Sequence, residues 1–333
     1  MARHPWVAEA DRGLRWGVQL IVPNEQDALS RLIETGRMVE ELGYDALFVF
    51  DHPSVHADPW IALAGLATAT TRVRLGSAVN CAWYRHPAYL ARLAADLDNL
   101  SRGRLILGVG SGWMESEFRA LDTPFLPIPD RQRGLDDALT IVQGVWGPTP
   151  FSYQGTHFRL EAMRVEPPPR QQPRPPILIG GSGERKTLRQ VARFGDACNV
   201  REAIAITDAT VTHDQRAEAV HRKYDALHAH LAELGRPADE VLRTHFTLYL
   251  LLAPTEAAVA SKLDRLDTAR STSPGTRRDG KVHVFGATPE QAIAYYRAIA
   301  AAGTQYFVVQ LDGTDHETIR LLAEEVAPQV AGA

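Results

Sequence analysis

Leu105-Ile-Leu-Gly-Val-Gly-Ser-Gly-Trp113 decides the fold of this 333-residue chain, because a buried-strand pattern runs here directly into a glycine-rich turn. A polar helix start, Met114-Glu-Ser-Glu-Phe118, follows it. The same pattern recurs at residues 46–52, 73–81 and 176–183. In a parallel barrel, the carboxyl ends of the strands carry the ligand site. The repeats therefore predict that the chemistry lies at one face of one barrel.

Short apolar stretches predict eight strands, at residues 15–22, 46–50, 73–79, 104–108, 177–179, 196–200, 244–252 and 306–311. Helices are expected between and after them, at residues 27–42, 59–70, 87–100, 131–146, 184–194, 212–234, 255–266, 288–302 and 317–326. No Gly-x-Gly-x-x-Gly motif opens an early helix, as the dinucleotide-binding doubly wound sheet would require. The alternation therefore predicts an α/β fold of the (β/α)8 TIM-barrel type.

Two interruptions break this alternation. In the first, over residues 147–176, Phe151-Ser-Tyr-Gln-Gly-Thr-His-Phe158 has the pattern of a hairpin, and six prolines between positions 167 and 176 exclude a regular helix. The alternation then resumes, so we interpret this segment as an insertion after the fourth helix. The second, a loop-rich insertion before the eighth strand, includes residues 271–280, which we expect to be a mobile loop or lid. We expect a single domain over residues 1–333.

Composition limits the function classes. A net charge of −4 at pH 7 argues against nucleic acid as a partner, because that would require a basic surface. The two cysteines, Cys81 and Cys198, cannot form a disulfide framework. The only histidines four apart are His52 and His56, and Pro53 between them opposes a metal-binding helix face, so we expect no metal. With no run of about 18 apolar residues and no apolar leader, we expect a cytoplasmic protein that does not enter a membrane.

Asp51-His52, at the end of a predicted strand, is the first candidate for catalysis. An aspartate can orient a histidine, and a histidine can exchange a proton near neutral pH. The alternative is a helix-capping aspartate beside a histidine that serves the structure only. The position at the carboxyl end of a barrel strand favours function, but from the residues alone both interpretations stay open.

Gly180-Gly-Ser-Gly-Glu-Arg-Lys186 also follows a predicted strand, and it is expected to open a helix. Backbone N–H groups in such a loop can face a phosphate, and the positive end of the helix favours an anion. The alternative is a tight turn with a capping serine. The Gly-Lys-Ser/Thr ending of a Walker loop is missing.

Weaker signals lie in other loops. Gly76-Ser-Ala-Val-Asn-Cys81 offers small side chains against which a flat ring could lie, although packing is the commoner reason for such a run. Four residues outside the strands suggest a pocket rim: Trp83, Tyr84, Trp113 and Met114. Three lesser candidates are interpreted as packing residues: Cys81, His245 and His283.

Four stretches occur in a characteristic order: Phe50-Asp-His52, Arg72-Val-Arg-Leu-Gly-Ser-Ala-Val-Asn80, Leu97-Asp-Asn-Leu-Ser-Arg-Gly-Arg-Leu-Ile-Leu-Gly-Val-Gly-Ser-Gly-Trp113 and Pro176-Ile-Leu-Ile-Gly-Gly-Ser-Gly183. Together they resemble the bacterial luciferase-like monooxygenase superfamily. Its members are (β/α)8 barrels that use either flavin mononucleotide (FMN) or the deazaflavin coenzyme F420. The similarity runs from about residue 15 to residue 200, and more loosely to residue 327.

The resemblance implies roles for these residues. Asp51 and His52 match a pair that contacts the cofactor and handles a proton over the reactive ring. The bond between Ala78 and Val79 matches a non-prolyl cis peptide behind that ring, and Asn80 is expected to contact the cofactor beside it.

Two glycine-containing loops complete the expected cofactor site. The resemblance implies that Ser111, Gly112 and Trp113 meet the ring and its side chain. It also implies that the next loop receives the cofactor phosphate, through Gly180, Gly181, Ser182 and Gly183.

Departures from the family pattern concern the substrate. The sugar-phosphate dehydrogenases of the F420 branch carry a glutamate where this chain has Trp113 and a tryptophan where it has His56. These differences imply a more apolar or aromatic substrate pocket, formed with Trp83, and argue against a sugar phosphate. Residues 201–286 match no pattern.

The leading hypothesis is an F420-dependent oxidoreductase that transfers a hydride between the deazaflavin and a small organic substrate, with His52 moving the proton. The alternative is an FMN-dependent monooxygenase that uses reduced flavin and dioxygen and needs a flavin reductase as partner. A third reading is a cofactor-binding or storage protein, against which His52 and the glycine loops argue. A homodimer is expected, through helices that flank the early strands, such as residues 59–70.

Overall fold

Eight parallel strands form the centre of the molecule. The computed structural model describes residues 3–21, 25–202, 208, 210–271 and 284–331. The strands are β1 (Arg15–Ile21), β2 (Ala46–Val49), β3 (Arg74–Ser77), β5 (Leu105–Gly110), β8 (Ile177–Gly180), β9 (Ala197–Asn199), β10 (Thr244–Thr247) and β13 (Tyr306–Asp312). They pair in the order β10-β13-β1-β2-β3-β5-β8-β9, with β4 (Asn80–Cys81) beside β5. Bridges from Ala197 to Leu242 and from Val200 to His245 join the two ends, so the sheet is a nearly closed barrel, as predicted.

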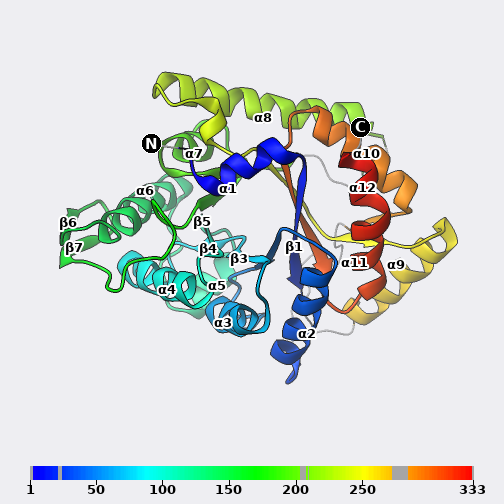
Figure 1. Ribbon diagram of the computed structural model, residues 1–333, viewed down its shortest axis with the longest axis horizontal. Helices are drawn as coiled ribbons and strands as arrows, with labels where there is room; N and C mark the ends of the chain where they lie inside the picture. The colour runs from blue at the N-terminus through cyan, green and yellow to red at the C-terminus, as the bar shows by residue number, and fades with distance from the viewer. Residues whose placement is uncertain (1–2, 22–24, 203–207, 209, 272–283, 332–333) are drawn as a thin grey trace.

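Helices surround the strands in Figure 1. The longer ones are α2 (Ala28–Glu41), α3 (Pro59–Ala69), α4 (Pro87–Leu100), α6 (Ile128–Val145), α7 (Thr187–Phe194), α8 (His213–Glu233), α9 (Glu256–Ser271) and α10 (Pro289–Ala301). The chain closes with α11 (His316–Leu321), the π-helical turn η3 (Leu322–Val326) and α12 (Ala327–Ala331). Local sequence explains several starts: the carboxylate of Asp58 caps α3 ahead of Pro59, and Thr212 and Thr288 form capping boxes for α8 and α10.

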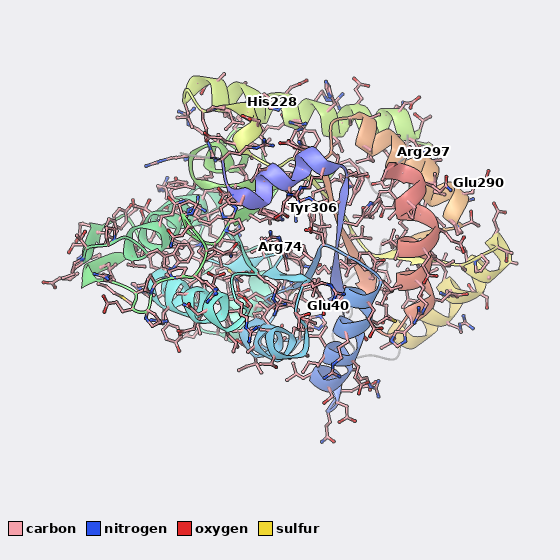
Figure 2. The ribbon with its side chains drawn as sticks, viewed as in Figure 1. Glu40, Arg74, His228, Glu290, Arg297 and Tyr306 are labelled. Atoms are coloured by element: carbon pink, nitrogen blue, oxygen red, sulfur yellow. The ribbon has the colours of Figure 1, made fainter. Side chains whose placement is uncertain are left out.

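Side chains from the first residues of several strands close the amino end of the barrel. Trp6 of α1 (Pro5–Ala8) is fully buried, and its ring meets that of Tyr306 edge-on at 5.7 Å. Glu9 of the 3-10 turn η1 (Glu9–Arg12) accepts from Arg74 at 2.6 Å. Tyr306 and Arg74, both labelled in Figure 2, begin their strands at this end. These described side chains fill the amino end, which leaves the carboxyl ends of the strands as the place to look for a ligand site.

The strand expected over residues 244–252 is wrong as a single element. Tyr249 has φ +45°, which breaks the extended backbone between β10 and β11 (Leu250–Leu252). β10 stays in the barrel, whereas β11 pairs in parallel with β12 (Phe285–Ala287) in a separate two-stranded sheet.

The insertion after the fourth helix is the expected hairpin. Its antiparallel strands are β6 (Phe151–Gln154) and β7 (Arg159–Met163). The carboxylate of Asp137 on α6 holds it, accepting from the hydroxyl of Tyr153 at 2.8 Å and the backbone N–H of His157 at 2.7 Å. The loop or lid expected at residues 271–280 lies, from residue 272 on, outside the described residues.

Candidate active site

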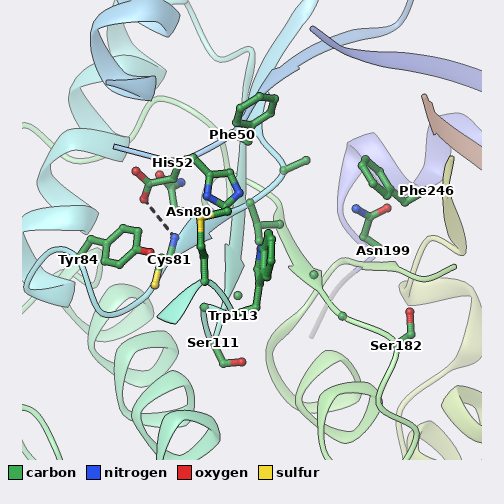
Figure 3. A pocket seen from close by; sticks show the side chains of 18 of the residues that line it. Phe50, His52, Asn80, Cys81, Tyr84, Ser111, Trp113, Ser182, Asn199 and Phe246 are labelled. Atoms are coloured by element: carbon green, nitrogen blue, oxygen red, sulfur yellow. Dashed lines mark hydrogen bonds between the residues drawn. The ribbon is translucent and has the colours of Figure 1, made fainter. Parts of the chain in front are cut away.

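Two adjoining cavities lie where the barrel strands end. Cavity A has a volume of about 390 Å³ and cavity B of about 600 Å³, and His52, Trp113 and Arg201 are among the residues that line both. Most of the residues expected at the site line cavity A: Asp51, His52, Ala78, Val79, Asn80, Ser111, Gly112, Trp113, Gly180, Gly181 and Ser182. In the view of Figure 3, His52 and Tyr84 lie to one side of Trp113, and Ser182 and Asn199 lie to the other.

A buried glutamate holds the side chain of His52. Nδ1 of His52 lies 2.9 Å from Oε2 of Glu117, on α5 (Glu115–Ala120). The hydroxyls of Ser54 and Tyr84 also donate to Glu117, at 2.8 and 2.9 Å. Burial raises the pKa of Glu117, but the hydrogen bonds and the facing His52 outweigh burial, and the net pKa lies below its ordinary value. Because a carboxylate only accepts, Nδ1 of His52 carries a hydrogen and Nε2 is left for the cavity.

Asp51 does not orient His52, so that part of the sequence interpretation is wrong. Oδ2 of Asp51 accepts from Arg85 at 2.7 Å and from the backbone N–H of Cys81 at 3.1 Å. Burial raises the pKa of Asp51, although the ion pair with Arg85 opposes the rise. The reason for the different partner is geometric: Asp51 points to the loop after β3, whereas His52 meets Glu117 from the loop after β5.

The peptide bond between Ala78 and Val79 is cis, as the resemblance implies. It connects β3 to β4 and lines cavity A. Nε2 of Gln19, on β1, donates to the carbonyl oxygen of Ala78 at 2.5 Å, and Nε2 of Gln310, on β13, donates to Oε1 of Gln19 at 2.7 Å. Two neighbouring strands thus hold this bond in place.

Two buried acceptors in the lining of cavity A have no hydrogen-bond partner among the described residues: Oδ1 of Asp51 and Oδ1 of Asn80. Nδ2 of Asn80 is satisfied, because it donates to the carbonyl oxygen of Gly108 at 3.1 Å. A buried acceptor without a partner costs free energy. Both oxygens are therefore suited to accept hydrogen bonds from a ligand with N–H groups.

The loop after β5 needs glycine at Gly112. Its φ is +74°, and a Cβ there would lie 2.6 Å from Sγ of Cys81 and 2.7 Å from the ring of Phe118. Ser111 accepts from Nε2 of Gln132 at 3.2 Å. Trp113 is 62% exposed, and its ring stands edge-on to that of His52 at 5.6 Å, so an indole borders the catalytic candidate.

The loop after β8 brings backbone and cationic groups together. A Cβ at Gly180 would lie 2.8 Å from the side chain of Val79, so this glycine lets the loop approach the cis bond closely. Oγ of Ser182 accepts from the backbone N–H of Arg201 at 3.0 Å, and its carbonyl oxygen accepts from Nζ of Lys223 at 3.1 Å. Arg201 is exposed at the rim of cavities A and B.

Two expectations for this loop need correction. Gly183 does not line cavity A; its carbonyl oxygen accepts from the N–H of Leu188, which turns it toward α7. The loop does not open a helix directly, because residues 184–186 form a turn and α7 begins at Thr187. The binding of a phosphate here would therefore depend on backbone amides and side chains of the loop more than on the end of a helix.

Of the substrate-pocket candidates other than Trp113, one lies in the expected place. His56 lines cavity B, with its ring edge-on to Phe50 at 4.2 Å. Trp83 lines neither cavity, so the structure does not bring it together with the other candidates. Its Nε1 donates to the carbonyl oxygen of Arg131 at 3.3 Å, and its ring packs on Phe158 of the inserted hairpin at 5.5 Å. The hairpin, which sequence reasoning did not place against this residue, occupies that side.

Sequence reasoning missed three kinds of site residue. In the sequence, Glu117 belongs to a polar helix start. The one sign that its side chain points inward is the next residue, Phe118, which is buried. Asn199 and Phe246 lie at or near strand ends and line cavity A. Arg201 follows β9 by two residues. The rule that polar residues follow barrel strands could have found Asn199 and Arg201.

A second buried ionisable cluster lies behind the loop after β9. Nε2 of His245 lies 2.8 Å from Oε2 of Glu202, and the hydroxyl of Tyr295 donates to Oε1 of Glu202 at 3.0 Å. Burial raises the pKa of Glu202, but the hydrogen bonds from His245 and Tyr295 outweigh burial and bring the net pKa down to about 2. His245 thus packs as expected, while His283 lies outside the described residues. The cluster anchors the segment that carries Arg201.

The thiol of Cys81 is not in its reactive, deprotonated form. Burial raises the pKa of Cys81 to about 12, so it stays a neutral thiol. Across the ranges that the structure describes, no three His, Cys, Asp or Glu side chains are grouped to hold a metal ion. Within the same ranges, no helix has the length and apolar character needed to cross a membrane.

Comparison with known proteins places this geometry in a family. An F420-dependent hydroxymycolic acid dehydrogenase of Mycobacterium tuberculosis is 30% identical over 201 residues, which cover 58% of this chain and 54% of that one. The chain spans about half the length of such curated relatives. An FMNH(2)-dependent dimethylsulfone monooxygenase of Pseudomonas putida is 34% identical over 110 residues, covering 33% of this chain and 30% of that one.

The fold has a close structural counterpart. The coenzyme F420-dependent tetrahydromethanopterin reductase of Methanopyrus kandleri superposes with a TM-score of 0.75 at 17% identity, covering 96% of this chain and 99% of that one. The family model for luciferase-like monooxygenases matches residues 14–316, from the first barrel strand to the start of α11. This chain therefore belongs to the luciferase-like monooxygenase family.

Proposed function

We propose that this protein is an F420-dependent oxidoreductase that transfers a hydride between the deazaflavin and a small organic substrate. The observation that carries the proposal is the pairing of His52 with the buried Glu117, at 2.9 Å, on the wall shared by cavities A and B. This pairing supplies a proton-handling imidazole between a space for a ring and a space for a substrate. Relatives and structural neighbours that carry F420 in their names support it.

The residues of cavity A fit a flat cofactor ring. The wall at Ala78 and Val79 has small or branched apolar side chains, and Gly180 keeps the opposite loop close to it. The imide edge of a flavin or deazaflavin carries an N–H group, which suits the partnerless oxygens of Asp51 and Asn80. In this proposal Ala78, Val79 and Asn80 hold the ring, with Ser111 and Gly112 beside it.

The phosphate end of the cofactor belongs at the loop after β8. Ser182 and the neighbouring backbone of Gly181 line cavity A, and Arg201 adds a guanidinium at the same rim. Lys223 donates to the Ser182 carbonyl and pairs with Glu184 at 3.3 Å, so it holds the loop rather than facing cavity A. A guanidinium beside loop backbone suits a phosphate group.

The mechanism assigns separate tasks to these side chains. When bound, the deazaflavin supplies the hydride chemistry. For an alcohol substrate, the carbinol carbon loses one hydrogen with two electrons as hydride, and Nε2 of His52 takes the hydroxyl proton; carbonyl reduction is the reverse. Glu117 fixes the Nδ1–H tautomer and stabilises the imidazolium that forms. Trp113, whose ring stands edge-on to His52 at 5.6 Å, borders the space in which the substrate would meet His52.

The alternative is an FMN-dependent monooxygenase that uses reduced flavin and dioxygen and draws its flavin from a reductase. The P. putida relative supports this reading, because its name specifies FMNH2. Both cofactors have the imide edge and a phosphate, so the preference for F420 in our proposal rests on the pair of His52 and Glu117 and on the F420-dependent relatives.

The test is an anaerobic assay. The purified protein is mixed with reduced F420 and a panel of small aldehydes and ketones, and the return of the 420-nm absorbance of the oxidised cofactor is followed. The proposal expects turnover without oxygen. Turnover that requires both oxygen and reduced FMN would establish the alternative.

A further inference from the structure

We infer that a third cavity, beside the second one, receives the apolar end of the substrate, and that the substrate is an uncharged alcohol or carbonyl compound with an unbranched alkyl chain. This inference rests on the proposed hydride transfer at His52. Cavity C has a volume of about 210 Å³ and lies between β1, β2, α2 and α3. Cavities B and C have Phe50 and His56 in common, so these two rings form the partition between them.

The lining of cavity B excludes most charged substrates. Apart from the two histidines, Arg201 is the one ionisable side chain that the described residues contribute to it, and Arg201 also belongs to the proposed phosphate end of cavity A. Gln19 and Gln310 are polar, but their Nε2 groups are engaged with the Ala78 carbonyl and with each other. The remaining lining is apolar, with Ile21, Val55 and Leu248 opposite the aromatic residues. A substrate with one hydroxyl or carbonyl oxygen near His52 and an otherwise apolar body would fit this lining.

Cavity C continues the same character. Its walls include Leu20, Leu29, Leu32 and Val49, which come from β1, α2 and β2. An apolar cavity of about 150 Å³ is large enough to bind benzene in a protein core, so 210 Å³ accommodates several methylene groups. The chain of the substrate would pass the edge-to-face pair of Phe50 and His56 to enter it.

Charge at the far side of cavity C selects a neutral chain end. The carboxylate of Glu25 lies there, paired with Arg31 at 2.9 Å, and both side chains are about half exposed. Among the described residues, no cationic side chain lines this cavity, and Glu25 already pairs with Arg31, so a carboxylate or phosphate at the end of the chain would find no cation to pair with there. An alkyl end avoids this cost.

The test measures binding to the apoprotein without any cofactor. Isothermal titration calorimetry is run with straight-chain 2-alkanones from propan-2-one to decan-2-one. Affinity is expected to rise about two- to fourfold for each methylene that enters the cavity, until cavity C is full. Ala28→Phe, which fills cavity C from a partly exposed position on α2, should weaken octan-2-one binding about tenfold and leave propan-2-one within twofold. Ser30→Phe, exposed on the same helix and outside cavity C, is the matched control.

A second variant acts in the opposite direction. His56→Ala widens the partition and should let decan-2-one bind at least threefold more tightly. Affinity that does not depend on chain length, or that falls equally in Ala28→Phe and Ser30→Phe, would overturn the inference. Because the binding assay contains no F420, its outcome is independent of the anaerobic turnover assay, and failure of the proposed function would be visible in the turnover assay alone.

Discussion

His52 illustrates what local sequence can and cannot predict about the site. Its place after a barrel strand predicted a cavity position, and the structure places it there. Its partner is 65 residues away in the chain, on a one-turn helix that the sequence presents as polar surface. The neighbouring Asp51 was the natural local choice, but backbone direction turns successive side chains to different loops. Pairing of this kind is a property of tertiary packing, which periodicity does not encode.

His52→Ala should lower turnover about 100-fold or more while leaving cofactor affinity within a few-fold, because a general acid–base contributes to the transition state more than to binding. Steady-state kinetics with a reducible substrate and a cofactor titration measure the two effects. His228→Ala, on α8 and outside the lining of cavities A and B, is the control; Figure 2 labels this residue. Unchanged turnover would remove His52 from the mechanism.

Glu117→Gln should lower kcat about tenfold, since Gln can present either an oxygen or an N–H group to Nδ1 of His52. Glu117→Asp, which keeps a carboxylate, should restore kcat in part. Steady-state kinetics measure both effects, and a kcat equal to that of the unmodified protein would contradict the role given to Glu117.

The same carboxylate predicts an acid effect on stability. The pKa of Glu117 is lower in the folded protein than its ordinary value of 4.5. Its stabilisation is therefore complete above pH 4.5 and is lost as the pH falls through the lowered value. Thermal unfolding between pH 3 and pH 7 should show a steeper acid loss for the unmodified protein than for Glu117→Gln.

At the scale of elements, the sequence predicted the eight strands and the inserted hairpin because apolar runs and turn residues are local signals. It failed over residues 244–252, where the Thr, Phe, Tyr and Leu residues suit an extended strand but Tyr249 adopts a positive φ. β11 leaves the barrel there to pair with β12, a partner more than 30 residues away. The start of α7 was misplaced for a related reason: residues 184–186 suit a helix, yet they form the turn that links the glycine loop to Thr187.

Gly112→Ala tests the loop after β5. A methyl group there meets Sγ of Cys81 and the Phe118 ring, in addition to the cost of a positive φ, so we expect a loss of about 3 kcal/mol in the free energy of unfolding. Gly235→Ala shares the positive φ but has open space around it, and should lose only about 1 kcal/mol. Equal losses, measured by urea unfolding, would show that close packing at Gly112 is not the reason for the glycine.

At the scale of the whole molecule, alternation of strands and helices was enough to predict a barrel, because a parallel sheet buried on both faces has few ways to close. The sequence did not show which loops cover the open end. Nor did it show that the hairpin would take Trp83 out of the substrate pocket. Which segments cover the open end depends on how the insertions fold against the barrel, and the alternation of strands and helices does not determine this.

The outer surface supports a proposed homodimer. Ile61 on α3 and Tyr89 on α4 are 62% and 60% exposed, and the two helices are neighbours in the fold. A stable pairing typically buries about 1,600 Å² in total, and large apolar side chains form its centre. The double variant Ile61→Glu, Tyr89→Glu should be a monomer by light scattering, whereas Leu234→Glu, at the end of α8, should not change the mass. A monomeric unmodified protein would refute the proposal.

The most direct test of the account is a fluorescence titration of the purified apoprotein with F420 and, in parallel, with FMN. We predict a dissociation constant for F420 in the micromolar range or below, and binding of FMN at least tenfold weaker. Preference for FMN would contradict the central claim, move the protein to the oxygen-dependent monooxygenases, and reduce His52 to a residue of the pocket wall.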